Sequence, residues 1–301
     1  MEQIQEVKFN GRELSALTRP ELLLFWIQER NQIRLQKELG LAKPWSEDVV
    51  FQNTYFCNVR REDDRVTKFV RGFYSPYVGS PFLEYNIILA RFLNWPPTLS
   101  SIGFLKSHSP ISLEESLARL AKKGKVWGGA YVITTHGIPM GKAAYLCHNV
   151  LGGVAGAMQS QGEPFFAWGN PGVAPLCSTA YKALQRFEGL GSFLAAQVVA
   201  DLKNTVGHPL YTASDRDTFV AHGPGSIRGL SWFWDSATIT PSNFYRYFDA
   251  MRLYVDENWN ETLMGPSICN QDLQNCLCEF DKYMRVSNGT GRSKRNYPGY
   301  A

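Results

Sequence analysis

The sequence predicts a mainly α-helical protein with at most a small β ribbon. Apolar residues recur at helical spacing along most of the chain, for example at Val66, Val70 and Phe73, which places them on one face of a helix. Glycine and proline separate these stretches at positions that suit helix ends. With 44% hydrophobic and 13% aromatic residues in a chain of 301, there is enough apolar surface to build a packed core.

Helix starts and stops define the individual elements. Pro20 suits the first turn of a helix that Gly40 ends, and Ser112 with Glu115 has the spacing of a capping box. Helices are expected at 20–39, 64–73, 112–123, 143–158, 174–187, 192–204, 242–258 and 271–286. Loops rich in Gly, Pro and Ser are expected at 74–81, 94–103, 136–141, 162–175 and 222–231. Only 130–135 has strand character and could form the ribbon.

The chain is expected to form one helical domain over 1–286, with two helical lobes around a cleft as the alternative. A basic flexible tail is expected at 287–301. No apolar run approaches the roughly 18 residues of a membrane span, and the acidic start of the chain is unlike a signal peptide. We therefore expect no membrane contact and a cytoplasmic location.

The charge distribution is mildly basic. The net charge is +4, which alone is weak evidence for a polyanionic partner. Basic residues cluster within 60–71, 122–125 and 292–295. Each cluster either contacts a polyanion or is a solvated helix face.

Six cysteines are sparse for a chain of this length and suit a reducing compartment. The gap from Cys269 to Cys276 resembles the start of an iron–sulfur loop, but Cys278 follows too soon and no fourth Cys comes after it. Buried free thiols are therefore expected here, and no metal site is predicted.

Gly189 and Gly191 lie in the most informative stretch of the sequence. They separate a helix from a second helix that starts at Ser192, and two glycines at this spacing allow positive φ and close backbone approach. The N–H groups at the start of the second helix can hold a phosphate. The stretch resembles the helix-hairpin-helix of DNA glycosylases, and an ordinary αα-hairpin with a glycine cap is the alternative.

A carboxylate follows this hairpin, as the catalytic Asp does in that superfamily. Asp217 is the preferred candidate, with Asp215 close by. Asp201 is an alternative, although its place on a helix suits a salt bridge better. Phe193 stands where bifunctional glycosylases carry a lysine, which argues against Schiff-base lyase chemistry.

A glycine-rich segment at 222–229 is predicted to bind phosphate. Gly223, Gly225 and Ser226 would form a nest of N–H donors, with Arg228 as a bidentate cation beside it. A purely structural turn is the alternative. The segment is not a P-loop, and the stretch that ends in Lys142 also departs from that motif.

Charged and amide side chains also gather at 58–65. If the segment is helical, Arg61 and Arg65 share a face. Asn58 would cap the helix or contact the edge of a base, and Asp64 lies between the arginines. A solvated charged face is the alternative.

The last predicted helix carries a polar stripe. Glu279 and Lys282 lie on one face with Asn275 and Tyr283. The stripe either lines a cleft or faces water.

Together the four segments resemble the alpha-glutamyl/putrescinyl thymine pyrophosphorylase family. Its relatives include phage amino acid:DNA transferases and the helical domain attached to 5-hydroxymethyluracil DNA kinases. The likeness spans about 21–285 and includes Lys142. It implies a helix-hairpin-helix, DNA-glycosylase-like fold. It also implies a double-stranded DNA substrate with a modified thymine, a free amino acid or polyamine as co-substrate, and a 5-hydroxymethyluracil DNA kinase as functional partner.

The resemblance implies transfer of an amine onto the 5-methylene of pyrophosphorylated 5-hydroxymethyluracil, with the base flipped out of the duplex and pyrophosphate released. Catalytic roles then fall to Asp217, Arg228 and Asp201. Substrate or pyrophosphate binding falls to Asn58, Arg61, Asp64, Arg65, Lys142, Gly223, Gly225, Ser226, Glu279 and Lys282. DNA contact falls to Gly189, Gly191 and Ser192.

No cofactor is indicated, although Mg²⁺ bridging the pyrophosphate is compatible with the chemistry. A DNA N-glycosylase for a modified thymine and a non-catalytic DNA-binding partner of the kinase are the alternative functions.

Overall fold

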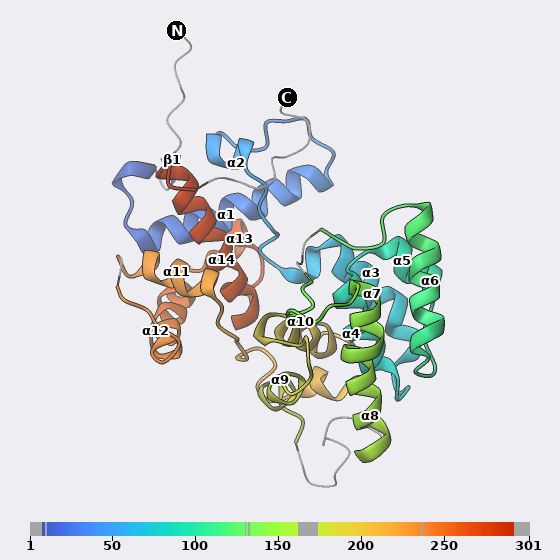
Figure 1. Cartoon of the computed structure of the whole chain (residues 1–301). Helices are drawn as coiled ribbons and strands as arrows, with labels where there is room; N and C mark the ends of the chain where they lie inside the picture. Colours follow the sequence, from blue (N-terminus) through green and yellow to red (C-terminus); the bar gives the residue numbers. More distant parts are fainter. Residues whose placement is uncertain are drawn as a thin grey trace. The chain divides into compact units, whose positions relative to one another are not determined.

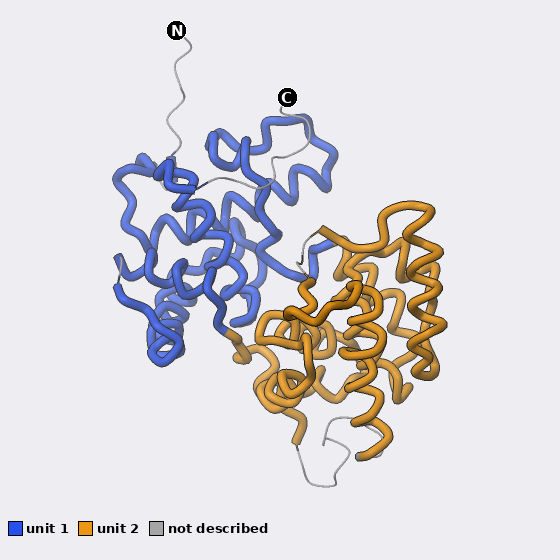
Figure 2. The backbone as a smooth tube through the Cα atoms, viewed as in Figure 1, with its two compact units in different colours: residues 1–64, 222–301 blue, residues 65–221 orange. Residues whose placement is uncertain are grey.

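The computed structural model describes residues 8–9, 11–129, 131, 133–161, 174–235 and 237–291. It is mainly helical and contains a small two-stranded antiparallel sheet (Figure 1), which confirms the predicted fold class. The chain forms two compact units (Figure 2). Unit 1 combines residues 1–64 and 222–301, and unit 2 consists of residues 65–221.

Unit 1 is built from both ends of the chain around the helices α1 (Arg19–Glu38) and α14 (Asn270–Ser287). The capping box at the start of α1 is formed by Thr18 and Glu21, and Leu39 caps its end. The other elements of unit 1 are β1 (Lys8–Phe9), β2 (Arg12–Glu13), η1 (Leu14–Ala16), α2 (Val49–Asn53), η2 (Arg61–Asp63), α11 (Pro224–Phe233), α12 (Phe244–Glu257) and α13 (Glu261–Met264). The predicted helices at 20–39, 242–258 and 271–286 are thereby confirmed.

The predicted loop at 222–231 is wrong, because this segment forms α11. Pro224 is the first helical residue, a position that suits proline because its missing N–H has no partner there. A Cβ at Gly229 would lie 2.1 Å from the carbonyl oxygen of Leu277, and one at Gly225 would lie 3.1 Å from Sγ of Cys278. These glycines, one turn apart, let the backbones of α11 and α14 pack closely.

Unit 2 has α4 (Leu83–Leu93) in its core, with all eleven residues buried. The element was not predicted, because a helix buried on every side lacks a polar face and therefore a 3.6-residue period. The other elements are α3 (Arg65–Tyr74), η3 (Ser75–Tyr77), α5 (Pro96–Ile102), α6 (Pro110–Lys123), α7 (Lys142–Ala144), η4 (Tyr145–Val150), α8 (Leu151–Gln161), α9 (Cys177–Leu184), α10 (Ser192–Lys203) and η6 (Pro209–Thr212).

The predicted helix at 143–158 is present as α7, η4 and α8, with η4 a π-helical stretch. The predicted helices at 174–187 and 192–204 are present as α9 and α10, with a turn between them. Gly189 has a φ of +77°, and a Cβ there would lie 2.8 Å from a methyl group of Val150. Only glycine fits this turn without strain.

Several local expectations are wrong. The described residues 131 and 133–135 form no strand, while 130 and 132 lie outside the described residues. The sheet lies instead near the N-terminus, where Lys8 pairs with Glu13. Ser112 does not cap α6, because the helix starts at Pro110 after Ser109. The expected loop at 94–103 contains α5.

The last helix ends one residue later than predicted, since α14 continues to Ser287. Residues 292–301, with the basic cluster at 292–295, lie outside the described residues, as do 162–173 of the expected loop at 162–175. No helix in the described ranges has both the length and the apolar character of a membrane span.

Candidate functional site

Three of the four predicted segments meet in unit 1, on α14. The first contains Asn58, the second is α11 with Arg228, and the third is α14 itself. The Asn275 side chain donates to the carbonyl oxygen of Asn58 over 3.5 Å, and Arg228 pairs with Asp281. The fourth segment, the glycine hairpin, belongs to unit 2.

Asp281 is the centre of a cation cluster on α14. Its side chain is only 1% exposed, yet Oδ2 accepts hydrogen bonds from Nε of Arg228 over 3.0 Å and from Nε of Arg285 over 3.2 Å. Oδ1 accepts one from Nε1 of Trp232 over 3.3 Å. A buried carboxylate thus holds two guanidinium groups and an indole in fixed orientations.

The arginines of this cluster remain open to solvent. Side-chain exposure is 53% for Arg228 and 36% for Arg285. Both use Nε toward Asp281, which leaves their terminal Nη groups available to acceptors on a ligand. The guanidinium of Arg19 lies 5.7 Å from the ring centroid of Trp232. We call Arg19, Arg228 and Arg285, with Asp281 and Trp232, the arginine cluster; three cations and one anion leave it a net positive charge.

Sequence reasoning found Arg228 but missed Asp281 and Arg285. The signal was present, since these two residues are four apart on a predicted helix and therefore share a face. The arrangement can bind a polyanion such as pyrophosphate, because guanidinium forks match phosphate oxygens in a bidentate manner.

The polar stripe of α14 contacts residues 55–58 of the same unit. Glu279 accepts the backbone N–H of Cys57 over 3.0 Å and the ammonium of Lys282 over 2.7 Å. Lys282 also donates to the carbonyl oxygen of Tyr55 over 3.3 Å and lies 5.2 Å from the ring centroid of Phe56. The stripe therefore fastens residues 55–57 to α14.

Farther along α14, the hydroxyl of Tyr283 donates to Asp48 over 2.7 Å. Burial raises the pKa of Asp48, against the opposing effect of this hydrogen bond. This buried pair ties α14 to the start of α2 and leaves neither group exposed for a ligand.

Asn58 and Arg61 are held by other residues of unit 1 rather than by a helix that spans 58–65. Buried Arg30 donates to Oδ1 of Asn58, and the backbone N–H of Arg61 donates to Asp272 over 3.0 Å. The expected common helical face of Arg61 and Arg65 is wrong, because Arg61 lies in η2, Asp64 is extended and α3 begins only at Arg65.

Ser226 and its neighbouring glycines stabilise the start of α11 and its packing on α14. The Ser226 side chain is buried; its hydroxyl accepts the N–H of Gly223 over 2.9 Å and donates to the Gly223 carbonyl over 3.1 Å. Gly225 packs on Cys278. Of the four residues predicted to bind phosphate here (Gly223, Gly225, Ser226 and Arg228), Arg228 is the exposed one.

The three candidate carboxylates of unit 2 have different surroundings. Asp201 is buried and accepts hydrogen bonds from both Nε and Nη2 of Arg91, which is buried as well. Asp215 accepts the backbone N–H groups of Cys177 and Ser178 over 2.7 and 2.9 Å. Burial alone would raise its pKa, but these hydrogen bonds outweigh burial and lower the pKa.

Asp217 is the exposed member of this set. Its side chain is 69% exposed and lies 2.9 Å from the guanidinium of Arg216. Gly191 and Ser192, at the start of α10, are exposed as well, and a Cβ at Gly191 would meet nothing within 4 Å. Lys142 is exposed at the start of α7.

The cysteines of α14 are packing residues. Burial raises the pKa of the Cys278 thiol to about 12 and also raises that of Cys276, so both stay protonated at neutral pH. Among the residues that the structure describes, no three His, Cys, Asp or Glu side chains gather as metal ligands.

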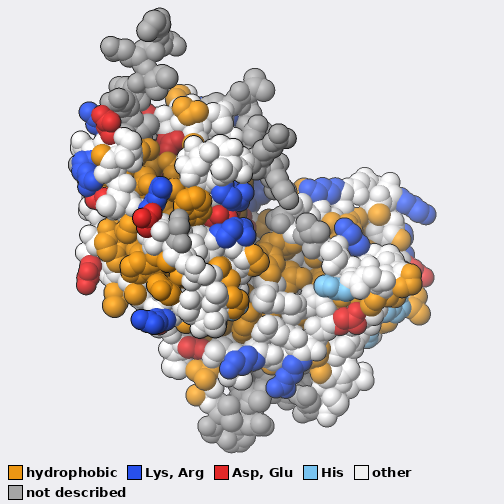
Figure 3. All heavy atoms as spheres, turned by 60° about the vertical axis from the view of Figure 1, so that its left-hand side comes forward, with side chains coloured by type: hydrophobic (Ala, Val, Ile, Leu, Met, Phe, Trp, Pro, Cys, Tyr) orange, Lys and Arg blue, Asp and Glu red, His pale blue; other side chains and the backbone are white. Residues whose placement is uncertain are grey.

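On the face drawn in Figure 3, Lys and Arg side chains lie at separate places.

A family model described as "5-hmdU DNA kinase, helical domain" matches residues 19–293. The match links the chain to the modification of hydroxymethyluracil in DNA. No curated protein and no solved structure shows significant similarity to it. The matched residues include α1, the hairpin, α11 and α14, and cover most of the sequence. The chain therefore belongs to the 5-hmdU DNA kinase helical-domain family.

Proposed function

We propose that this protein transfers an amine or amino acid to the 5-methylene of pyrophosphorylated 5-hydroxymethyluracil in double-stranded DNA and releases pyrophosphate. The arginine cluster is the observation that carries the proposal. Family membership supplies the hydroxymethyluracil context, and a buried acid that orients exposed guanidinium groups suits a leaving group with several phosphate oxygens.

The reaction needs little covalent participation from the protein. The amine nitrogen attacks the exocyclic methylene and forms a C–N bond, while the C–O bond to pyrophosphate breaks and its electron pair leaves with the pyrophosphate. Arg228 and Arg285 would stabilise the negative charge that develops on that group, an electrostatic effect that is usually the largest in such reactions. Their fixed orientation on Asp281 means that little reorganisation is required.

The attacking nitrogen must also lose a proton. Asp217 is our proposed acceptor, because it is the exposed carboxylate of the three candidates, whereas Asp201 and Asp215 are held by partners inside unit 2. Proton transfer to a positioned carboxylate is a common contribution to catalysis.

DNA would be held in part by the hairpin. The first N–H groups of α10, next to the open Gly191, suit a backbone phosphate without reading base sequence. A free amine or amino acid and a 5-hydroxymethyluracil DNA kinase complete the proposed partners, since the kinase would supply the pyrophosphorylated base. Mg²⁺ bridging the pyrophosphate is compatible with this chemistry.

The direct test is to incubate the protein with duplex DNA that carries pyrophosphorylated hydroxymethyluracil, a panel of amines and Mg²⁺. Digestion to nucleosides should reveal a thymidine whose mass is increased by the bound amine, with one pyrophosphate released per product. If neither product forms with any amine of the panel, the transfer is refuted. Strand cleavage after alkali would instead identify a glycosylase, because abasic sites are alkali-labile.

A non-catalytic role is the second candidate: the chain would bind DNA and present it to a hydroxymethyluracil DNA kinase. The family description favours it, because it names a helical domain of such a kinase. DNA binding that persists without any base chemistry, together with stimulation of an added kinase, would support this alternative.

A further inference from the structure

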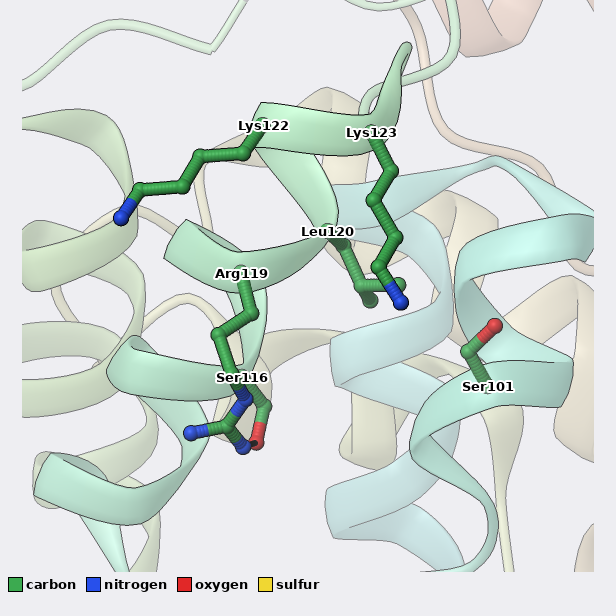
Figure 4. A pocket seen from close by; sticks show the side chains of 6 residues that line it. All are labelled: Ser101, Ser116, Arg119, Leu120, Lys122 and Lys123. Carbon is green, nitrogen blue, oxygen red and sulfur yellow. Dashed lines mark hydrogen bonds between the residues drawn. The ribbon is translucent and has the colours of Figure 1, made fainter.

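A basic hollow on the surface of unit 2 lies apart from the residues considered so far (Figure 4). It has a volume of about 350 Å³ and is lined by Ser101 of α5 and by residues of α6: Ser116, Arg119, Leu120, Lys122 and Lys123. In Figure 4 the Lys123 side chain extends from α6 toward the side of Ser101, and Lys122 extends the other way along the rim.

The lining determines what the hollow can bind. Both hydroxyl protons are used inside their own helices, since Ser101 donates to the Pro97 carbonyl and Ser116 to the Ser112 carbonyl, each over 2.8 Å. Arg119 donates to the Ser116 hydroxyl over 2.8 Å, which fixes the guanidinium beside the hollow. The groups left to bind a ligand are cationic donors, so the ligand must be an anion.

Neighbouring acids do not neutralise this site. Glu115, one turn back on α6, lies 3.9 Å from Arg119, with both side chains 65% exposed; such a pair is weak. Glu114 pairs with His148. Beyond the helix, the Lys125 ammonium lies 4.2 Å from the ring centroid of Trp95 and adds a fourth cation to residues 119–125.

We propose that this hollow binds the phosphate backbone of nucleic acid, as a contact additional to the hairpin and the arginine cluster. The inference rests on the proposed function for its choice of partner, since that function has DNA as its substrate. Lys122 and Lys123 supply compact charges and Arg119 a fork, a combination that suits phosphate oxygens without any reading of bases.

The test uses unmodified duplex DNA, so that it does not depend on amine transfer. In Lys122→Gln/Lys123→Gln, affinity at 50–150 mM salt should fall about tenfold, and the slope of log K against log salt should become shallower by about two. The matched control, Lys106→Gln/Arg246→Gln, removes two exposed charges that do not line the hollow and should change affinity by less than twofold. Circular dichroism should be unchanged in both variants, because glutamine is a good helix former.

A second measurement requires no substitution. Acetylation of lysines followed by mass spectrometry should show that duplex DNA protects Lys122 and Lys123, whereas Lys106 stays reactive. Binding of poly-glutamate, an acidic polypeptide, is measured alongside DNA binding. An unchanged salt slope in Lys122→Gln/Lys123→Gln would overturn the proposal, as would an equal loss of affinity in the control variant. It would also be overturned if Lys122→Gln/Lys123→Gln lost poly-glutamate binding but bound DNA normally. If wild-type protein fails to transfer any amine but the salt effect remains, the transferase proposal fails and the phosphate site stands.

Discussion

The two units use charged side chains in different ways. In unit 2, Arg91 and Asp201 enclose each other, with side-chain exposures of 2% and 3%. In unit 1, Asp281 is equally buried, but its partner Arg228 is 53% exposed. An enclosed pair can only support the fold, whereas a buried acid with exposed partners can also orient them toward a ligand. Exposure of the partner therefore distinguishes the candidate site from the structural pair.

The largest expected effect concerns Asp217, the exposed one of the three candidate carboxylates. Asp217→Asn should lower the single-turnover rate of transfer by roughly 10²–10⁴, because the attacking amine loses its proton acceptor. Affinity for the same DNA should change by less than twofold. Asp249→Asn, which alters an exposed carboxylate on α12 of unit 1, is the control and should be fully active. Equal rates for both variants would remove Asp217 from the mechanism.

The difference between the enclosed pair Arg91–Asp201 and the half-exposed pair Arg228–Asp281 can be tested by removing each arginine. Arg91→Met should lower the free energy of unfolding by about 3–5 kcal/mol, because it leaves Asp201 buried without its charge partner. Arg228→Met should lower it by about 1 kcal/mol or less, since the lost partner is half exposed and Asp281 keeps Arg285. Urea unfolding of both variants measures the difference.

Restoring a neutral pair provides the control for that experiment. Arg91→Met combined with Asp201→Leu should recover much of the lost stability, because the buried charge is gone. Equal losses for Arg91→Met and Arg228→Met would contradict the distinction between the two units.

Glycines offer a second comparison. Gly229→Ala should cost about 1–3 kcal/mol of stability, since its Cβ would lie 2.1 Å from the Leu277 carbonyl oxygen and force α11 away from α14. Gly191→Ala should be near neutral for stability, because nothing lies within 4 Å. Thermal unfolding monitored by circular dichroism tests both. A stable Gly229→Ala would mean that the close packing of α11 on α14 is absent in solution.

The smallest expected effect depends on pH. The pKa of Asp215 is lowered in the folded protein, so its ionised form stabilises the fold above the unfolded pKa of about 3.9. That contribution is lost as pH falls from about 4 through the lower folded pKa. Asp215 accepts hydrogen bonds from the first N–H groups of α9 and so acts as a cap on that helix. Asp215→Asn should therefore be less stable by about 1 kcal/mol at pH 7, as expected when a helix cap is lost, and the difference from wild type should shrink below pH 4. A constant difference across this range would contradict the role of the ionised carboxylate.

Helices with a polar and an apolar face could be predicted from the sequence, and α3, α12 and α14 were. The helix α4 could not, because it is buried on every side, and α11 was mistaken for a turn because its glycines serve packing against α14. In both cases the neighbouring elements, which the local sequence does not specify, determine the structure.

The candidate site was predictable only in part. Arg228, Glu279 and Lys282 attracted attention as charged residues, yet two of them fasten residues 55–57 and only Arg228 stays exposed. Which charges are enclosed depends on tertiary packing, and Asp281 gained its role only once α11 lay against α14. Residue type indicated the chemistry, whereas burial decided which residues can perform it.

The central claim is that the arginine cluster binds the pyrophosphate of the modified base. The most direct measurement compares the affinities of wild type and Arg228→Ala/Arg285→Ala for two duplexes of one sequence, with and without a pyrophosphorylated hydroxymethyluracil. Wild type should prefer the modified duplex, and the variant should lose that preference, by roughly 1–3 kcal/mol per arginine, while it binds the unmodified duplex within twofold of wild type. A variant that still prefers the modified duplex as strongly as wild type would contradict the account.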